Sequence, residues 1–176
     1  MKLKFEPVTE KNRAQALRLH GAPGQEGLVE PVEQCLAEAE QWKGWRPVLI
    51  LDGERPVGFA MYGKFPLESF PFGRVWLDRL LIAGEHQGRG YGKAALAGLI
   101  QRLREEYRCK KIYLSIVEGN WAAAELYQKF GFRFTGEIPT GNRSWCTSVP
   151  ENRKRNGPYH VVWPIFSQTV RHRGWR

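Results

Sequence analysis

A glycine-rich segment between a strand-like run and a helical pattern constrains the fold of this chain most. The segment reads Gln87-Gly88-Arg89-Gly90-Tyr91-Gly92-Lys93, follows the apolar run Val75–Ile82 and precedes a helical pattern over Lys93–Tyr107. A glycine turn that opens a helix leaves backbone N–H groups free at the positive end of the helix dipole. Arg89 and Lys93 add two full positive charges. The segment therefore predicts a strand–loop–helix unit that binds a phosphate group.

Two common phosphate-binding loops do not fit these residues. A Walker loop places Ser or Thr after Gly-Lys to hold magnesium, but Ala94 follows Gly92-Lys93 here. A dinucleotide loop has a different glycine spacing and an acidic residue about 20 positions later, where this chain has Cys109-Lys110-Lys111. Gln87, Gly90 and Gly92 instead have the spacing Gln-x-x-Gly-x-Gly, a third type of phosphate-binding loop. The alternative is a glycine-rich turn that binds nothing.

The hydropathy pattern predicts strands that alternate with helices along the chain. We expect strands over 3–8, 47–51, 56–62, 75–82, 112–117, 132–138 and 159–166. We expect helices from a cap at Thr9 to Leu19, from Pro31 to Trp42, over 93–107, and from a cap at Asn120 to Phe130, with Gly131 as the left-handed stop. This order predicts an α+β fold: a mixed sheet flanked by helices, with a right-handed crossover from Val75 to Val117.

Length and composition favour one globular domain. The chain has 176 residues, of which 42% are hydrophobic and 26% charged. We expect a core over 1–138, followed over 139–176 by a long loop, a last strand and a basic tail of uncertain role. No apolar run is long enough to span a bilayer, the start lacks a signal-peptide pattern, and three scattered cysteines predict neither a disulfide framework nor a metal site. A cytoplasmic protein without membrane contact is expected.

The net charge of +9 is concentrated towards the C-terminal end. From Glu137 onward seven basic residues face two acidic ones, so this segment contributes +5; the basic residues are Arg143, Arg153, Lys154, Arg155, Arg171, Arg173 and Arg176. A basic tail can bind nucleic acid, but it can equally be solvated or face an anionic cofactor. No nucleic-acid-binding motif accompanies it, so nucleic acid is an unlikely partner.

A second motif, Asn120-Trp121-Ala122-Ala123-Ala124-Glu125-Leu126-Tyr127-Gln128-Lys129-Phe130-Gly131-Phe132, follows the next predicted strand. On a helix, Asn120, Ala124 and Tyr127 share one face. Together with the glycine loop, this pattern resembles the GNAT N-acetyltransferases. That resemblance implies a mostly antiparallel sheet with splayed central strands.

The region from Gln25 to Glu137 is similar to one branch of that family, the bacterial diamine and spermine/spermidine acetyltransferases. The matching segments include "LILDGERPVGFAMYG" and "VWLDRLLIAGEHQGRGYG". That branch commonly has Asn at the position of Val32 and Ser at that of Cys35, so the acceptor is less certain than the donor. The resemblance implies transfer of acetyl from acetyl-CoA to a primary amine of a polyamine, by direct attack in a ternary complex.

The resemblance also assigns a cofactor site. Backbone N–H groups of the loop would bind the diphosphate, those of Leu80 and Ile82 would orient and polarise the thioester carbonyl, and Asn120 would form a hydrogen bond with the cofactor. Lys129 would contact the phosphates or remain solvated. The cofactor residues expected are Leu80, Leu81, Ile82, Gln87, Gly88, Arg89, Gly90, Tyr91, Gly92, Lys93, Asn120, Tyr127 and Lys129.

Two residues are the expected catalytic groups. Tyr127 would hydrogen-bond the departing thiolate and keep its own proton, because transfer from a phenol of pKa about 10 to the thiolate of a thiol of pKa about 8.5 is uphill. The alternative is a tyrosine that only packs at the helix end. Asp78 would bind the acceptor and take its proton, unless it forms a surface pair with Arg79 or a cap. Glu26, Glu30 and Glu33 would bind distant ammonium groups or remain solvated helix charges.

Three other functions stay open at this point. The acceptor could be another cationic amine, such as a protein N-terminus, a lysine or an aminoglycoside. The chain could be a non-catalytic acetyl-CoA-binding module, against which Tyr127 and Asp78 argue. It could also bind nucleic acid through its tail. A small-molecule acceptor and a homo-oligomer, specifically a dimer, are expected.

Overall fold

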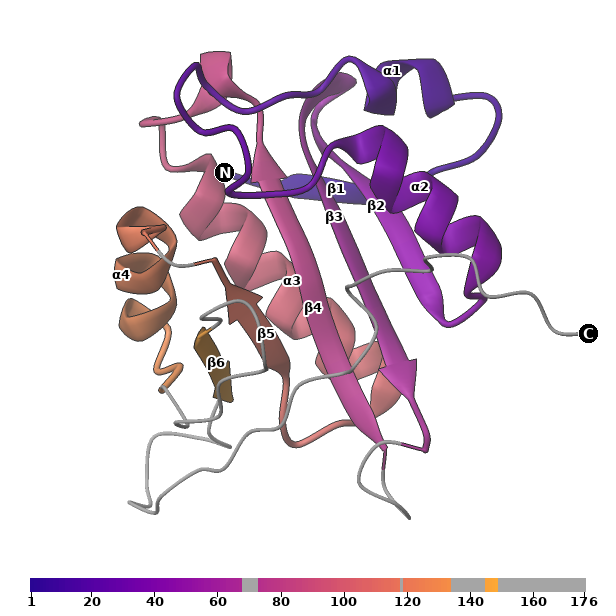
Figure 1. Cartoon of the computed structure of the whole chain (residues 1–176), viewed down its shortest axis with the longest axis vertical. Coiled ribbons are helices and arrows are strands. Elements are labelled where there is room, and N and C mark those ends of the chain that lie inside the picture. The colour runs from indigo at the N-terminus through magenta and orange to yellow at the C-terminus, as the bar shows by residue number, and fades with distance from the viewer. Residues whose placement is uncertain (68–72, 118, 134–144, 149–176) are drawn as a thin grey trace, which may run out of the picture.

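The computed structural model describes residues 1–67, 73–117, 119–133 and 145–148, and it arranges them as one mixed sheet with helices on both faces (Figure 1). The elements in chain order are β1 (Leu3–Pro7), α1 (Arg13–Leu17), α2 (Val32–Gln41), β2 (Trp45–Asp52), β3 (Arg55–Phe65), β4 (Arg74–Ile82), the short 3₁₀ turn η1 (Gly84–His86), α3 (Tyr91–Tyr107), β5 (Tyr113–Ile116), α4 (Trp121–Lys129) and β6 (Trp145–Ser148).

The sheet follows the chain order β1-β2-β3-β4-β5-β6, and every neighbouring pair is antiparallel except β4 and β5. That parallel pair requires a crossover, which α3 supplies after the glycine loop. The α+β fold with a mixed, mostly antiparallel sheet is therefore confirmed. The right-handedness of the crossover stays a prediction.

Two hydrophobic clusters, one on each face of the sheet, hold the layers together. Residues of α3 and α4, such as Leu96, Leu99 and Tyr127, pack on one face. Residues of α1 and α2, such as Ala16 and Leu36, pack on the other. Both faces of β2 to β4 are covered, which explains their long apolar runs.

The ends of the elements show where local sequence signals were sufficient. Asn120 caps α4, since its Oδ1 accepts a hydrogen bond from the Ala123 N–H at 3.2 Å, and Gly131 adopts φ +82° as expected of the stop. The predicted cap of the first helix at Thr9 is wrong, since Asn12 is the N-cap residue. The Thr9 N–H is bound by the Asn12 side chain in a turn, and the helix begins at Arg13.

The closing strands differ from the prediction. Phe132 and Arg133 lie outside any strand, and the Phe132 side chain is buried in the core instead. Residues 134–138 and 159–166, where the rest of both predicted strands fall, lie outside the described residues. The strand that pairs with β5 is Trp145–Ser148, inside the segment predicted to be a long loop.

Candidate active site

A β-bulge interrupts the pairing of β4 with β3 close to the point where β4 and β5 stop pairing. Leu77 pairs with Tyr62 and Arg79 pairs with Met61, so Asp78 is an extra residue without an opposite partner on β3. A bulge bends its strand and increases its twist. The only register pair between β4 and β5 is Trp76 with Tyr113, just before the bulge. Beyond Trp76, β4 has no register partner on β5, and this is the predicted splay.

The far end of β4 consequently has an open edge. The Ala83 N–H donates to the Val57 carbonyl on β3. Because N–H groups alternate in an antiparallel pair, Leu81 also faces β3, while the N–H groups of Leu80 and Ile82 face away from it. The Ile82 carbonyl agrees, since it accepts a hydrogen bond from the Gln87 side chain on that open side at 2.9 Å. Leu80 and Ile82 thus present the two amides that the sequence predicted.

The glycine loop forms a cradle at the start of α3. Gly88 and Gly90 have φ of +73° and +83°, which side chains rarely adopt, and a Cβ on either would meet no atom within 4 Å. The first turn of α3 leaves its N–H groups without helical partners. Arg89 and Lys93 are exposed beside it. Open space, free amides and positive charge fit the diphosphate of acetyl-CoA.

This cradle opens into a cleft of about 760 Å³, a volume typical of small-molecule sites. Leu80, Leu81 and Ile82 line it from β4, and the loop lines it through Gln87, Gly88 and Gly92. Asn120, Ala122, Ala123 and Leu126 line it from α4, while residues between 17 and 33 form the facing wall. The structure therefore brings together most of the predicted cofactor residues.

The side chains of Gln87 and Tyr91, both predicted cofactor residues, have partners in the protein. The Gln87 side chain donates to Gln25 Oε1 at 2.8 Å and to the Ile82 carbonyl, and its N–H donates to the Gly84 carbonyl. The Tyr91 hydroxyl lies 2.6 Å from Asp52 Oδ2. Gln87 therefore joins the loop to β4 and to the facing wall, and only the backbone of Tyr91 remains for a ligand.

The α4 residues divide between the cleft and the core. Asn120 caps the helix through Oδ1 and also lines the cleft. Tyr127 is buried, its ring lies 5.8 Å from that of Phe132, and burial raises its pKa to about 12. It does not line the cleft, although Ala123 and Leu126 next to it do. Lys129 pairs with Glu125 at 2.6 Å on the exposed side of α4, away from the cleft lining.

The facing wall carries carboxylates. Glu26, Glu30 and Glu33 all line the cleft, as does the buried Val32. Hydrogen bonds from backbone N–H groups, including that of Gly24, lower the pKa of Glu26, so this side chain is ionised at neutral pH. Negative charge therefore lies opposite the positive cradle, on the wall where the sequence predicted the acceptor.

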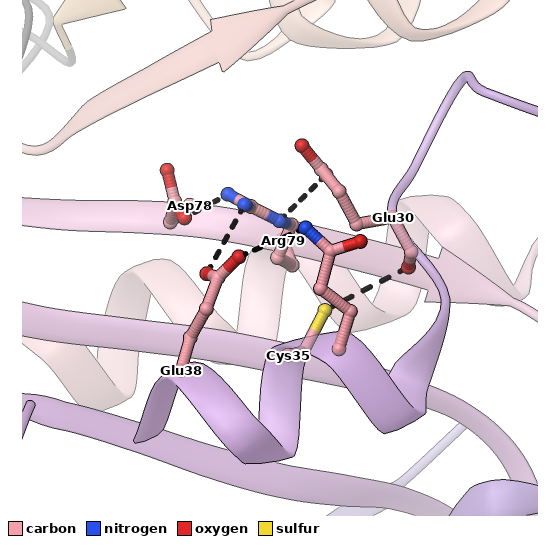
Figure 2. Close-up of polar contacts among 6 residues, drawn as sticks. Glu30, Cys35, Glu38, Asp78 and Arg79 are labelled. Carbon is pink, nitrogen blue, oxygen red and sulfur yellow. Dashed lines mark hydrogen bonds and ion pairs between the residues drawn. The ribbon is translucent and has the colours of Figure 1, made fainter. Parts of the chain in front are cut away.

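Asp78 is connected to this wall through Arg79. Its carboxylate, only 11% exposed, pairs with Arg79, whose side chain reaches towards Glu30 and Glu38 (Figure 2). Burial raises the pKa of Asp78 to about 6, and Arg79 opposes that rise. The expected surface pair with Arg79 does form, but it is buried, and Asp78 itself does not line the cleft.

Arg79, Glu38 and Gln25 were not among the predicted site residues. Glu30 and Glu38 are far from Arg79 in the chain, and only the packing of α2 on the sheet brings them to it. The adjacent pair Asp78-Arg79 was a visible signal. Within the ranges that the structure describes, no group of three His, Cys, Asp or Glu residues could hold a metal, and no helix is long and apolar enough to cross a membrane.

Residues 15–132 match the model of the acetyltransferase (GNAT) family. The chain belongs to the GNAT acetyltransferase family. It is 48% identical over 141 residues to the spermine/spermidine N(1)-acetyltransferase of Bacillus subtilis (strain 168), which covers 78% of this chain and 92% of that protein. This GNAT protein is thus an acetyl-CoA-dependent N-acetyltransferase, as the sequence predicted.

Solved structures agree on the fold. An acetyltransferase from Thermus thermophilus superposes with a TM-score of 0.66 at 25% identity, covering 86% of this chain and 98% of that one. A spermidine N-acetyltransferase from Vibrio cholerae, crystallised with CoA and spermine, gives a TM-score of 0.62 at 17% identity, covering 83% of this chain and 92% of that one. Both support the GNAT architecture with its splayed central strands.

Proposed function

We propose that this enzyme transfers the acetyl group of acetyl-CoA to a primary amine of a polyamine, such as spermine, spermidine or a diamine. One observation carries the proposal: a single cleft has a positive phosphate cradle at one end and three glutamates on the facing wall. An anionic donor and a polycationic acceptor fit these two ends. The similarity to the Bacillus subtilis enzyme supports the same substrate class.

The donor end supplies binding and orientation. Bound acetyl-CoA supplies an acetyl group activated as a thioester. The N–H groups from Gly88 to Lys93 would bind its diphosphate, and those of Leu80 and Ile82, on the open edge of β4, would hydrogen-bond its extended arm and its carbonyl. Asn120 lines the same cleft and would add its amide group.

The acceptor end must both attract and deprotonate the amine. A polyamine nitrogen with a pKa near 10.4 is almost fully protonated at pH 7, so a carboxylate is needed to take its proton before direct attack in a ternary complex. Asp78, with its pKa raised to about 6, has a proton affinity suited to that role near neutral pH. We propose that Asp78, which does not line the cleft, acts through water, while Glu26, Glu30 and Glu33 bind the ammonium groups.

Tyr127 would stabilise the thiolate by a hydrogen bond. Its hydroxyl has no hydrogen-bond partner among the residues that the structure describes, and its pKa of about 12 keeps it protonated. The phenol therefore remains a donor throughout the neutral range. This supports hydrogen-bond stabilisation rather than full proton transfer.

An amine panel tests the acceptor class. Thiol release would be measured with spermine, spermidine, a diamine, a lysine peptide, a peptide N-terminus and an aminoglycoside. We expect the highest kcat/KM for the polyamines. A preference for a peptide or an aminoglycoside would instead support the alternative acceptors, and binding of acetyl-CoA without turnover on every amine would make the protein a non-catalytic module.

The glutamate wall has a matched control. Glu33 lines the cleft, whereas Glu40, on the same helix, pairs with Arg13 outside it. Glu33→Gln should raise KM for spermine severalfold and leave KM for a monoamine nearly unchanged, while Glu40→Gln should change neither. Equal effects of the two substitutions on KM would show that Glu33 does not bind the acceptor.

We also propose that the enzyme acts in the cytoplasm. Cys35 and Cys109 are free thiols, which suits a reducing compartment. A homodimer stays a prediction, and sedimentation of the purified protein with and without CoA would test it.

A further inference from the structure

Arg79 occupies the centre of a buried charge cluster between β4 and α2. Its Nε lies 2.7 Å from Glu30 Oε2, one Nη lies 3.4 Å from Glu38 Oε2, and the other contacts Asp78 (Figure 2). The Arg79 side chain is only 7% exposed. A guanidinium buried this deeply is rare unless its charge is compensated, and here carboxylates from three different segments compensate it.

The cluster connects the bulge to the acceptor wall. Asp78 is the extra residue of the bulge, Glu30 lines the cleft just before α2, and Glu38 lies one helical turn beyond Cys35. The Glu30 carbonyl also accepts a weak hydrogen bond from the Cys35 thiol at 3.7 Å. Moving Arg79 would therefore release three carboxylates at once, and one of them, Glu30, lines the cleft.

The charges in this cluster do not balance. Three carboxylates surround one guanidinium, so the ionised cluster carries a formal charge of −2. Burial raises the pKa of the Asp78 carboxyl. The negative charges of Glu30 and Glu38 raise this pKa further, and the positive charge of Arg79 lowers it. Burial also raises the pKa of Cys35 to about 12, so this neighbouring thiol stays neutral.

We propose that Arg79 is a positioning residue for the acetyl transfer: it holds the Asp78 and Glu30 carboxylates in place at the acceptor end of the cleft and sets the pH range in which they act. This inference rests on the proposed function, since Asp78 is the proposed base. Arg79 itself does not line the cleft, so it acts through its two partners.

The pH profile of kcat/KM gives a signed test. The acid limb of this profile reports ionisation of the base in the free enzyme. Arg79→Gln removes the only group of the cluster that lowers the pKa of Asp78, so the acid limb should move to higher pH, by about one to three units. Glu38→Gln removes a neighbouring negative charge, so the limb should move to lower pH.

Three variants serve as controls. Arg74→Gln removes another buried arginine from the same strand, and Glu40→Gln removes an exposed carboxylate from the same helix as Glu38; neither should move the acid limb. Arg79→Lys keeps the charge but lacks the planar fork. Its limb should lie closer to the wild-type position than that of Arg79→Gln, which a merely structural role would not produce.

A substrate-free readout separates this inference from the proposed function. The ¹³C shift of the Asp78 carboxyl, assigned by comparison with Asp78→Asn, can be titrated in wild type, Arg79→Gln and Glu38→Gln. Opposite shifts of the Asp78 titration and of the acid limb in the two variants are expected. Unmoved titrations in folded variants would overturn the role of Arg79, whether or not polyamines are the substrates. Should Arg79→Gln fail to fold, Glu38→Gln, at a partly exposed position, still decides through the sign of its shift.

Discussion

The Tyr127 hydroxyl illustrates how one buried group can be assigned a role. Its pKa of about 12 results from desolvation alone. No hydrogen bond joins this hydroxyl to the described residues, and its oxygen is not among their fully buried unpartnered atoms. A residue kept only for packing would lose nothing on replacement by phenylalanine, which preserves the ring contact with Phe132.

Tyr127→Phe should therefore lower kcat by about tenfold or more, because a hydrogen bond to the developing thiolate is lost. The melting temperature and the dissociation constant of CoA should both change little. Stopped-flow acetyl transfer, calorimetry and thermal unfolding measure the three quantities. A variant with full turnover would make Tyr127 a core residue only.

The raised pKa of Asp78 predicts how the free energy of unfolding depends on pH, independently of activity. Its pKa is raised from 3.8 to about 6 in the folded state, mainly by burial. A raised pKa means that the folded state binds the proton more tightly, so this contribution is present below about pH 4 and is lost as the pH rises through 6. Asp78→Asn, which cannot ionise, should gain stability relative to wild type between pH 4 and pH 7.

The gain should be on the order of 2 kcal/mol. Urea unfolding of both proteins at pH 4 and pH 7 measures it. A difference between wild type and variant that is the same at both pH values would show that the carboxyl titrates normally, and Asp78 would then be unsuited to act as a base near neutral pH.

At the scale of elements, the cradle depends on backbone shape more than on side chains. Gly90 and Gly53 provide a matched comparison: both have positive φ, +83° and +63°, and a Cβ on either meets nothing within 4 Å. Alanine at either position should cost about 1–2 kcal/mol in backbone strain. Only Gly90→Ala places a methyl group beside the phosphate-binding amides.

Gly90→Ala should raise the dissociation constant of CoA by tenfold or more, while Gly53→Ala, in the β2–β3 turn, should leave it unchanged. Calorimetric titration with CoA, together with unfolding of both variants, tests this. Equal CoA affinity in the two variants would contradict a diphosphate site in the loop.

Asn120 caps α4 and also lines the cleft, and one substitution can separate these two roles. Asn120→Ser keeps an oxygen that can accept from the Ala123 N–H but removes the side-chain amide that faces the cleft. Stability should be preserved within about 0.5 kcal/mol, and affinity for acetyl-CoA should fall. An unchanged affinity would leave Asn120 as a helix cap alone.

Local signals predicted those elements whose causes lie within the element itself. The glycine loop, the cap at Asn120 and the stop at Gly131 are set by residues a few positions apart, so the sequence predicted each of them. The bulge at Asp78 depends on the register against β3, and the Arg79 cluster depends on the packing of α2 on the sheet. Neither partner is visible from the residue itself, and so the buried state of Asp78 was not predicted.

For the whole molecule, charge is separated across one cleft within a positively charged protein. The net charge of +9 favours approach of the anionic donor, whereas a polycation must be attracted locally by the glutamates of the facing wall. Such contacts between exposed groups are screened by salt. KM for spermine should therefore rise between about 0.05 and about 0.5 M salt more steeply than KM for a monoamine, and parallel curves would contradict an electrostatic acceptor wall.

The most direct test mixes the purified full chain with acetyl-CoA and spermine or spermidine, and follows thiol release together with the mass of the amine. Acetylated polyamine equal in amount to the CoA released is the predicted result, with both products formed more slowly by Gly90→Ala at subsaturating acetyl-CoA. An enzyme that binds CoA at the glycine loop but leaves every polyamine unmodified would contradict it.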